Sequence, residues 1–229
     1  MFQHLFEACT SETAFGCAIE NPRSDAITLA KQTWGDASPP RREPGPSLVK
    51  RVDCLLAALP LLVDGHDDAL ARQIAVLGLA RTGVILRRLR HGNRRRFNLI
   101  VVPDAVRQDA KHLAGLTRLR RRESRANRHL VLVGETTIDR QPRLANALLI
   151  TECAGFLPSA SGRLAVIALL AESGATELAA LLPLLRRQVD PAASVLALVA
   201  AKALAVDLDR PLGPHSLVRL SPSAIQARH

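Results

Sequence analysis

The chain has 229 residues and a net charge of +10, with 48% hydrophobic and 23% charged residues. This balance is typical of a globular protein with a core and excludes an intrinsically disordered chain. Aromatic residues make up only 3% and there is no Tyr, so we expect a core of Leu, Val, Ile and Ala. The same scarcity argues against an aromatic base-stacking platform.

The cysteines and the apolar runs bear on the compartment. The four cysteines form no CxxC pair, so no zinc site is predicted. The first residues lack a basic region followed by a long apolar run, which argues against a signal peptide. The apolar runs are shorter than the roughly 18 residues that a membrane span needs. We therefore expect a cytoplasmic protein with no membrane contact.

The N-terminal part is expected to contain little structure before residue 47. Residues 1–46 end in a Pro-, Gly- and Ser-rich stretch with the composition of a linker. Ser47 is a good helix N-cap, and apolar residues recur at helical spacing after it. A second helix is predicted over 67–79, with acidic residues in its first turn.

A change of hydrophobic period after residue 82 predicts strands. Residues 83–90 and 96–102 are predicted to pair as a hairpin around a Gly-Asn turn. A helix over 104–126 and a short apolar strand over 130–133 are expected next. This order predicts an α/β (α+β) fold with a small mixed sheet flanked by helices, in a domain spanning 47–157.

The remaining residues are expected to form a winged-helix domain over 158–221, followed by a tail over 222–229. Before this domain, Pro142 is predicted to occupy the first position, N1, of another helix. The predicted elements of the winged helix are helices over 160–172, 176–187 and 191–204, and strands over 205–209 and 216–220. The helix over 191–204 offers only Ser194 and Lys202 as polar groups, so we favour protein docking over base reading.

The positive charge is concentrated in one stretch. Residues 81–128 hold fourteen arginines and Lys111 against three acidic residues, a net charge of +12, whereas the rest of the chain sums to −2. Guanidinium groups suit phosphate oxygens, so contact with DNA is predicted. An acidic protein partner and a solvated face remain as alternatives. The predicted DNA contacts are Arg87, Arg88, Arg90, Arg94, Arg95 and Arg96 in the hairpin, and Arg118, Arg120, Arg121, Arg122 and Arg125 in the next helix.

No catalytic motif is present. GxSxG, Walker A, GxGxxG and HExxH are all absent. Mg²⁺-dependent nucleases need carboxylates that converge from neighbouring strands. The inward positions of the predicted strands hold apolar residues instead: Val84, Leu86, Ile100 and Val102. We therefore predict no catalytic residue, no metal and no cofactor.

Two segments nevertheless resemble a nuclease family. Residues 129–149, HLVLVGETTIDRQPRLANALL, resemble the segment after the nuclease core of TnsA-type transposon-end endonucleases. Residues 195–218, with DLDRPLGPHSLV, resemble that family's closing winged helix. The resemblance implies a restriction-endonuclease-like core and partners that include DNA, a transposase or an AAA+ regulator ATPase.

The resemblance also indicates which residues the family would use for catalysis. The family has an acidic residue on its first helix, an Asp on one strand and an E-x-K pair on the next. The matching positions here are Val49 or Lys50, then Val84, then Ile100 and Val102. The resemblance thus implies a catalytically inactive relative that binds DNA.

Two other functions stay open at this stage. The first is an active Mg²⁺-dependent nuclease that uses Asp67, Asp104 and Asp109, which requires two of these carboxylates near a common point. The second is a winged-helix regulator unconnected with transposition, which requires basic residues on the exposed side of the helix over 191–204.

Overall fold

The helices begin where the sequence supplies caps. The structure is a computed structural model that describes residues 45–91 and 95–222, so most of the predictions for 1–46 and 222–229 lie outside it. Helix α2 (Leu48–Ala58) is capped by the Ser47 hydroxyl, which accepts from the Lys50 amide. Helix α3 (Asp68–Val76) is capped by Asp67, whose Oδ1 lies 3.0 Å from the Leu70 nitrogen.

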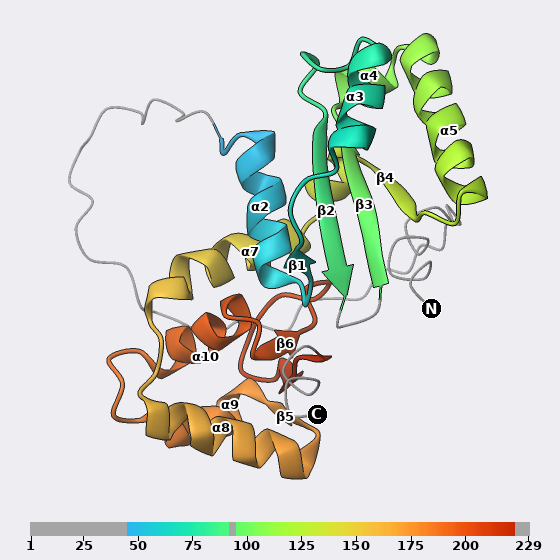
Figure 1. The fold of residues 1–229 in the computed structure, drawn as a ribbon. Helices are drawn as coiled ribbons and strands as arrows, with labels where there is room; N and C mark the ends of the chain where they lie inside the picture. Colours follow the sequence, from blue (N-terminus) through green and yellow to red (C-terminus); the bar gives the residue numbers. More distant parts are fainter. Residues whose placement is uncertain (1–44, 92–94, 223–229) are drawn as a thin grey trace, which may run out of the picture. The chain divides into compact units, whose positions relative to one another are not determined.

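The hairpin forms as the sequence predicts and lies within a four-stranded sheet (Figure 1). Strands β2 (Ile85–His91) and β3 (Arg95–Val102) pair antiparallel, and β4 (Leu130–Gly134) pairs parallel to β3. A two-residue strand, β1 (Leu62–Val63), pairs antiparallel with β2 and completes the order β1-β2-β3-β4. The predicted mixed sheet flanked by helices is confirmed, although β1 is too short for the sequence pattern to reveal.

The single helix predicted over 104–126 is wrong. The chain forms a four-residue helix, α4 (Asp104–Arg107), and then a longer one, α5 (Ala110–Arg125). The break occurs because the Asp109 carboxylate accepts from the Lys111 and His112 amides and starts a new helix. The second helix therefore has its own direction over the sheet.

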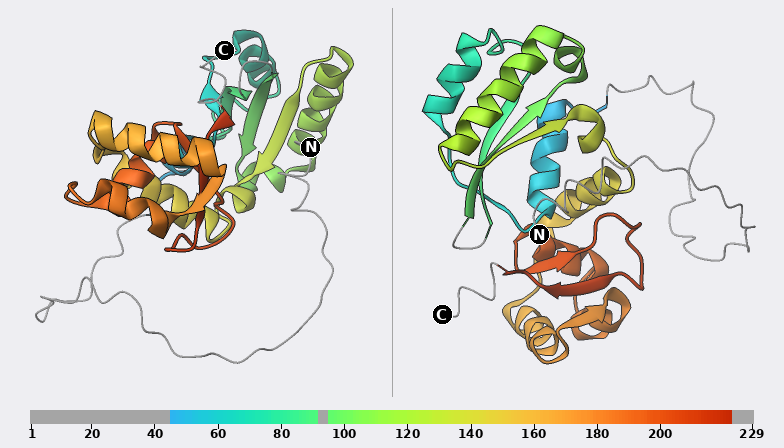
Figure 2. Two further views of the ribbon diagram at one scale, coloured as in Figure 1. Left: turned by 90° about the horizontal axis from the view of Figure 1, so that it is seen from below. Right: turned by 90° about the vertical axis from the view of Figure 1, so that its right-hand side faces the viewer.

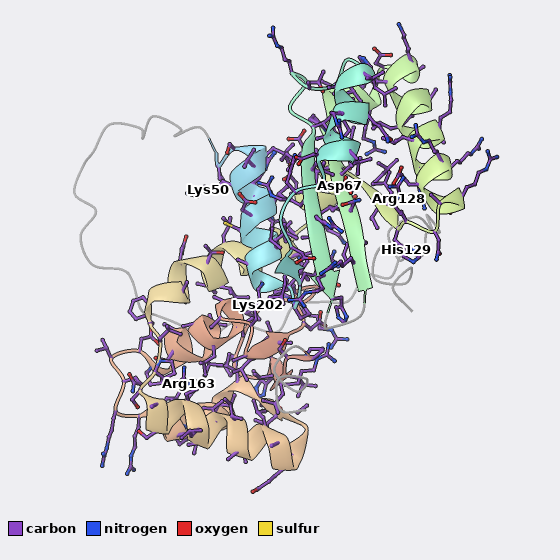
Figure 3. All side chains as sticks on the ribbon, in the orientation of Figure 1. Lys50, Asp67, Arg128, His129, Arg163 and Lys202 are labelled. Carbon is purple, nitrogen blue, oxygen red and sulfur yellow. The ribbon has the colours of Figure 1, made fainter. Side chains whose placement is uncertain are left out.

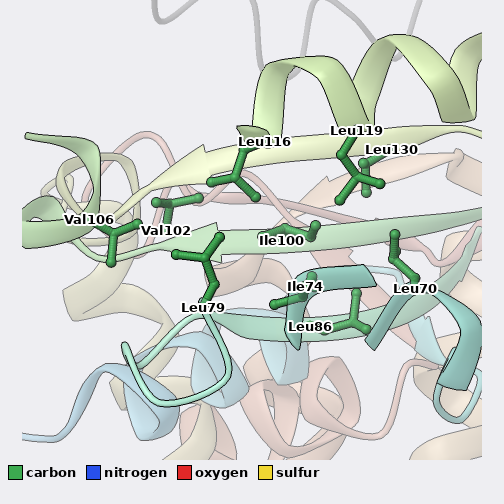
Figure 4. Close-up of a cluster of buried hydrophobic side chains, with 10 residues drawn as sticks. All are labelled: Leu70, Ile74, Leu79, Leu86, Ile100, Val102, Val106, Leu116, Leu119 and Leu130. Carbon is green, nitrogen blue, oxygen red and sulfur yellow. The ribbon is translucent and has the colours of Figure 1, made fainter. Parts of the chain in front are cut away.

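Strand alternation places the apolar positions of β2 and β3 under α3 and α5. Leu86 is paired with Ile100 in register and both side chains are buried. They belong to a cluster that Figure 4 shows between the sheet and the helices: Leu70, Ile74, Leu79, Leu86, Ile100, Val102, Val106, Leu116, Leu119 and Leu130. Helices α3 and α5 thus cover one face of the sheet, and α2 and α7 (Arg143–Glu152) lie on the other (Figure 2).

The C-terminal part contains helices and a second small sheet. Its elements are α6 (Glu135–Ile138), α7, η1 (Cys153–Gly155), α8 (Ala160–Ser173), β5 (Ala175–Glu177), α9 (Leu178–Leu181), η2 (Leu182–Leu185), α10 (Pro191–Ala200), β6 (Leu204–Val206) and β7 (Leu217–Leu220). The strands form an antiparallel sheet in the order β5-β7-β6. The continuous helix predicted over 176–187 is wrong, because β5 occupies its start and Pro183 lies in a 3₁₀ turn at its end.

Helix α10 is almost entirely buried. Residues 193–199 are all shielded from solvent, and the Ser194 hydroxyl donates to the Asp190 carbonyl oxygen at 2.9 Å. Just after the helix, Lys202 Nζ lies within 2.6 Å of the carbonyl oxygens of Leu56, Ala57 and Leu59 at the end of α2. Neither of the two polar groups of the predicted helix is left on an exposed helix face, because Ser194 bonds within α10 and Lys202 bonds to α2.

Candidate nucleic-acid interface

Four arginines of α5 line one outward side of the helix. Leu116, Leu119 and Glu123 are buried and mark the side that faces the sheet. Residues separated by three, four and seven positions share a helix face. We call the resulting set the α5 arginine stripe: Arg118, Arg121, Arg122 and Arg125. Figure 3 shows side chains of α5 that extend away from the sheet into solvent.

The stripe carries uncompensated charge. All four side chains are exposed, and none of them forms an ion pair with any residue that the structure describes. Seven residues of helix rise about 10 Å, so four positive charges lie along a short line. Arg120 is also exposed, on the other flank of the helix. Like charges this close repel one another, and an anion bound beside them would offset that repulsion.

The single acidic residue within α5 does not neutralise the stripe. Glu123 points inward and is only 2% exposed. Its carboxylate accepts from Arg128, with Nε–Oε2 at 2.8 Å and Nη2–Oε1 at 3.1 Å. Arg128 is therefore neutralised, while the outward arginines keep their charge.

The hairpin arginines divide between the two faces of the sheet. Alternation places Arg88, Arg90 and Arg96 on the face that α3 and α5 cover. Arg87 projects from the other face and forms an ion pair with Asp53 of α2 at 3.0 Å. The charge of Arg87 is therefore offset by a carboxylate, unlike the charges of the exposed arginines on α5. Arg94 lies outside the described residues, and Arg95 is placed only by its backbone in β3.

Acidic residues offset much of the remaining hairpin charge. Arg96 Nε lies 2.8 Å from Asp64 Oδ2. Asp67 accepts from Asn98 Nδ2 at 3.0 Å. Figure 3 shows Asp67 close to Arg128, and the charge of Arg88 also acts on Asp67. Burial opposes it, but hydrogen bonds from the Leu70 amide and Asn98, with the charges of Arg88 and Arg128, lower the pKa of Asp67. The hairpin is thus a weaker anion site than α5.

Two carboxylates of the nuclease alternative, those of Asp67 and Asp104, lie far apart. Asp67 contacts Asn98 near the start of β3, whereas Asp104 follows the end of that strand, roughly 20 Å further along it by strand rise. Asp109 caps α5 and pairs with His112 at 2.9 Å. Among residues 45–91 and 95–222 no three His, Cys, Asp or Glu side chains gather as a metal site would require. The structure therefore separates Asp67 from Asp104, and the pair of carboxylates that the nuclease alternative requires is not formed by these two residues.

The positions that match the family's catalytic residues are also separated. Ile100 and Val102 lie in the buried cluster, and Val84 packs against it. Val49 and Lys50 are exposed on α2, which lies on the opposite face of the sheet. None of the five side chains is acidic, so these positions cannot hold a divalent cation.

Sequence reasoning missed the role of two polar residues on α7. The Arg143 guanidinium is buried and binds both carboxylate oxygens of Asp209, with Nε–Oδ1 at 2.9 Å and Nη2–Oδ2 at 2.8 Å. This hydrogen bonding lowers the pKa of Asp209. Asn146 donates to the carbonyl oxygens of Leu208 and Arg210 at 2.9 and 2.7 Å.

These contacts join the two segments that carry the family resemblance. The three-residue spacing of Arg143 and Asn146 on one helix face was visible in the sequence, but their partners lie more than sixty residues away. Both residues hold the loop between β6 and β7 against α7. Their role is therefore structural.

Comparisons with known proteins leave the geometry as the basis for assigning a function. No protein-family model, no curated protein and no solved structure matches the chain. Within the described part of the chain, no helix is both long and apolar enough to cross a bilayer. The α5 arginine stripe is the strongest candidate for a binding surface.

Proposed function

We propose that the protein binds DNA through phosphate contacts made by the α5 arginine stripe and does not cut it. The observation that carries this proposal is the row of four exposed guanidiniums without acidic partners among the described residues. A DNA backbone supplies phosphates in a row, and each contact releases condensed counterions. Binding therefore relieves the repulsion within the stripe and gains entropy from released ions.

The proposal extends to a catalytically inactive relative of TnsA-type endonucleases. The order of the elements from α2 to β4 supports a restriction-endonuclease-like core, and the apolar residues at its catalytic positions support loss of cleavage. The order α8, β5, α9, α10, β6, β7, with a three-stranded antiparallel sheet, supports a winged helix. The partners would then include a transposase or an AAA+ regulator ATPase.

Base reading by the winged helix is the weaker candidate. A reading helix needs basic or amide side chains on an exposed side. Helix α10 is buried, and Lys202 bonds to α2. The DNA contacts are therefore assigned to α5, and the C-terminal part is left for contacts with protein.

A salt titration of DNA binding tests the proposal. Four phosphate contacts predict that log affinity falls with log salt at a slope of about −3.6, which is roughly a 150-fold loss between 50 and 200 mM. Replacing Arg118, Arg121, Arg122 and Arg125 with Ser should remove most of that slope. The matched control removes the same charge elsewhere on exposed positions: Arg72, Arg81, Arg163 and Arg219 to Ser.

The control separates a local site from a general charge effect. We expect the control variant to keep most of the wild-type slope. A stripe variant with wild-type affinity, or a control that loses as much as the stripe variant, would overturn the assignment. Cleavage of duplex DNA by the wild-type protein with Mg²⁺ would overturn the absence of nuclease activity.

A further inference from the structure

Two neighbouring loops of the C-terminal part expose large apolar side chains. Phe156 and Leu157 precede α8 and are 48% and 56% exposed, and Val189 precedes α10 and is 99% exposed. Leu184 in η2 is 40% exposed. We call these four residues the apolar loop patch. Soluble proteins leave such groups of side chains in water mainly where another molecule covers them.

Contacts beside the patch connect the segments that carry it. Gln188 Nε2 donates to Ser159 Oγ at 3.4 Å and so links the two loops. The Leu185 side chain packs against Gly162 so closely that a Cβ there would lie 2.8 Å from Leu185 Cδ2. At the other end the Phe156 amide donates to the Cys153 carbonyl oxygen at 2.9 Å. These contacts fix the backbone from which the patch side chains extend.

A positive rim adjoins the patch. Arg186 and Arg187 lie between Leu184 and Val189, and both are exposed. Neither forms an ion pair with any residue in the described ranges. The carboxylate of nearby Asp190 accepts from the Ala193 amide as the cap of α10. The surface therefore combines apolar anchors with two free positive charges.

We propose that this surface docks a short segment of a protein partner in which large apolar side chains stand next to acidic residues. The apolar residues would cover Phe156 and Val189, and the carboxylates would meet Arg186 and Arg187. A second copy of the chain fits less well, because a two-fold interface would bring the same arginines of both copies together. This surface is independent of the α5 arginine stripe.

A displayed library of random peptides, selected on the full-length protein, tests the proposal. We expect enriched peptides that contain Leu, Phe or Trp beside Asp or Glu. Their affinity should fall about tenfold or more on Phe156→Ser with Val189→Ser, because apolar anchors dominate such interfaces. It should fall several-fold on Arg186→Ser with Arg187→Ser, and this loss should shrink at high salt.

Several results would decide against the proposal. It is overturned if the enriched peptides bind the Phe156→Ser, Val189→Ser variant as well as the wild type, or if they lack acidic residues. It is also overturned if sedimentation shows a dimer that this variant abolishes, because the patch then covers itself. DNA binding by the same variant should equal that of the wild type, which confirms its folding and separates this test from that of the stripe.

Discussion

Helices α5 and α10 differ in composition and in burial: α5 is rich in arginine and mostly exposed, whereas α10 is rich in alanine and mostly buried. In α5 three residues face the sheet and most of the others face solvent. In α10 seven of ten residues are buried. Helix α10 therefore offers no exposed polar side chains that could read bases. The comparison teaches that the distribution of charge, rather than the order of elements, indicates where a polyanion would bind.

The largest expected effect is a loss of stability caused by a substitution in the buried helix α10. Leu198 of α10 is 1% exposed, so Leu198→Ala should lower the free energy of unfolding by about 3 kcal/mol through lost burial and a cavity. Urea unfolding measures this, with Arg121→Ala on α5 as a control that should change stability by less than about 0.5 kcal/mol. Equal losses at the two sites would break the contrast between the helices.

The next effect concerns the pH dependence of stability. Burial lowers the pKa of Lys202 to about 8, whereas the unfolded chain keeps a value near 10.4. Between these values the unfolded state binds more protons, so the free energy of unfolding rises with pH. The slope contributed by Lys202 should stay below about 1.4 kcal/mol per pH unit, because a single group binds at most one proton.

A Lys202→Met variant isolates this contribution. The free energy of unfolding of the variant is subtracted from that of the wild type at each pH from 7 to 10. In this difference the contributions of all other titrating groups cancel. The difference should grow in favour of the wild type as pH rises through 8. A flat difference would show that Lys202 titrates alike in the folded and unfolded states.

A smaller effect should come from the inward side of α5. Glu123→Gln removes the negative charge that neutralises Arg128, so Arg128 becomes available to phosphate. One added phosphate contact steepens the salt slope by about 0.9, which is roughly a threefold greater loss of affinity between 50 and 200 mM. An unchanged slope would mean that Arg128 stays out of reach of DNA.

The smallest effect should come from the far side of the sheet. Arg87→Ser removes a charge that is already paired with Asp53, so DNA affinity should change by less than about twofold at any salt. Arg122→Ser, the same substitution on the stripe, should lower the slope by about 0.9. If Arg87→Ser matched Arg122→Ser, both faces of the sheet would have to contact DNA.

Local signals in the sequence predicted much of the fold. The Gly-Asn pair in the sequence and the alternating apolar residues predicted the pairing of β2 with β3, and Ser47 marked a helix start that the structure confirms. Strands β1 and β5 have two and three residues, so their pairing depends on neighbours rather than on pattern. The start of a separate helix after Asp109 was missed, because the apolar residues on both sides of it recur at helical spacing as if one helix ran through.

The candidate site was predictable only in part. The spacing of Arg118, Arg121, Arg122 and Arg125 could be read directly, because helix periodicity is local. Strand alternation could also have assigned Arg87 and Arg88 to opposite faces, since they are adjacent. The partners of Arg96 and Arg143 could not be predicted, because Asp64 and Asp209 meet them only through tertiary packing.

The bond from Lys202 to the end of α2 affects how the molecule can be divided for experiments. The ammonium donates to the carbonyl oxygens of Leu56 and Ala57, which lie in the last turn of that helix, and to that of Leu59 just after it. A fragment that stops at residue 157 lacks Lys202 and so loses these hydrogen bonds. It also exposes the side of α7 that Asp209 covers. The two halves are therefore best expressed together, and protease digestion of the native protein should not release an N-terminal half that stays folded.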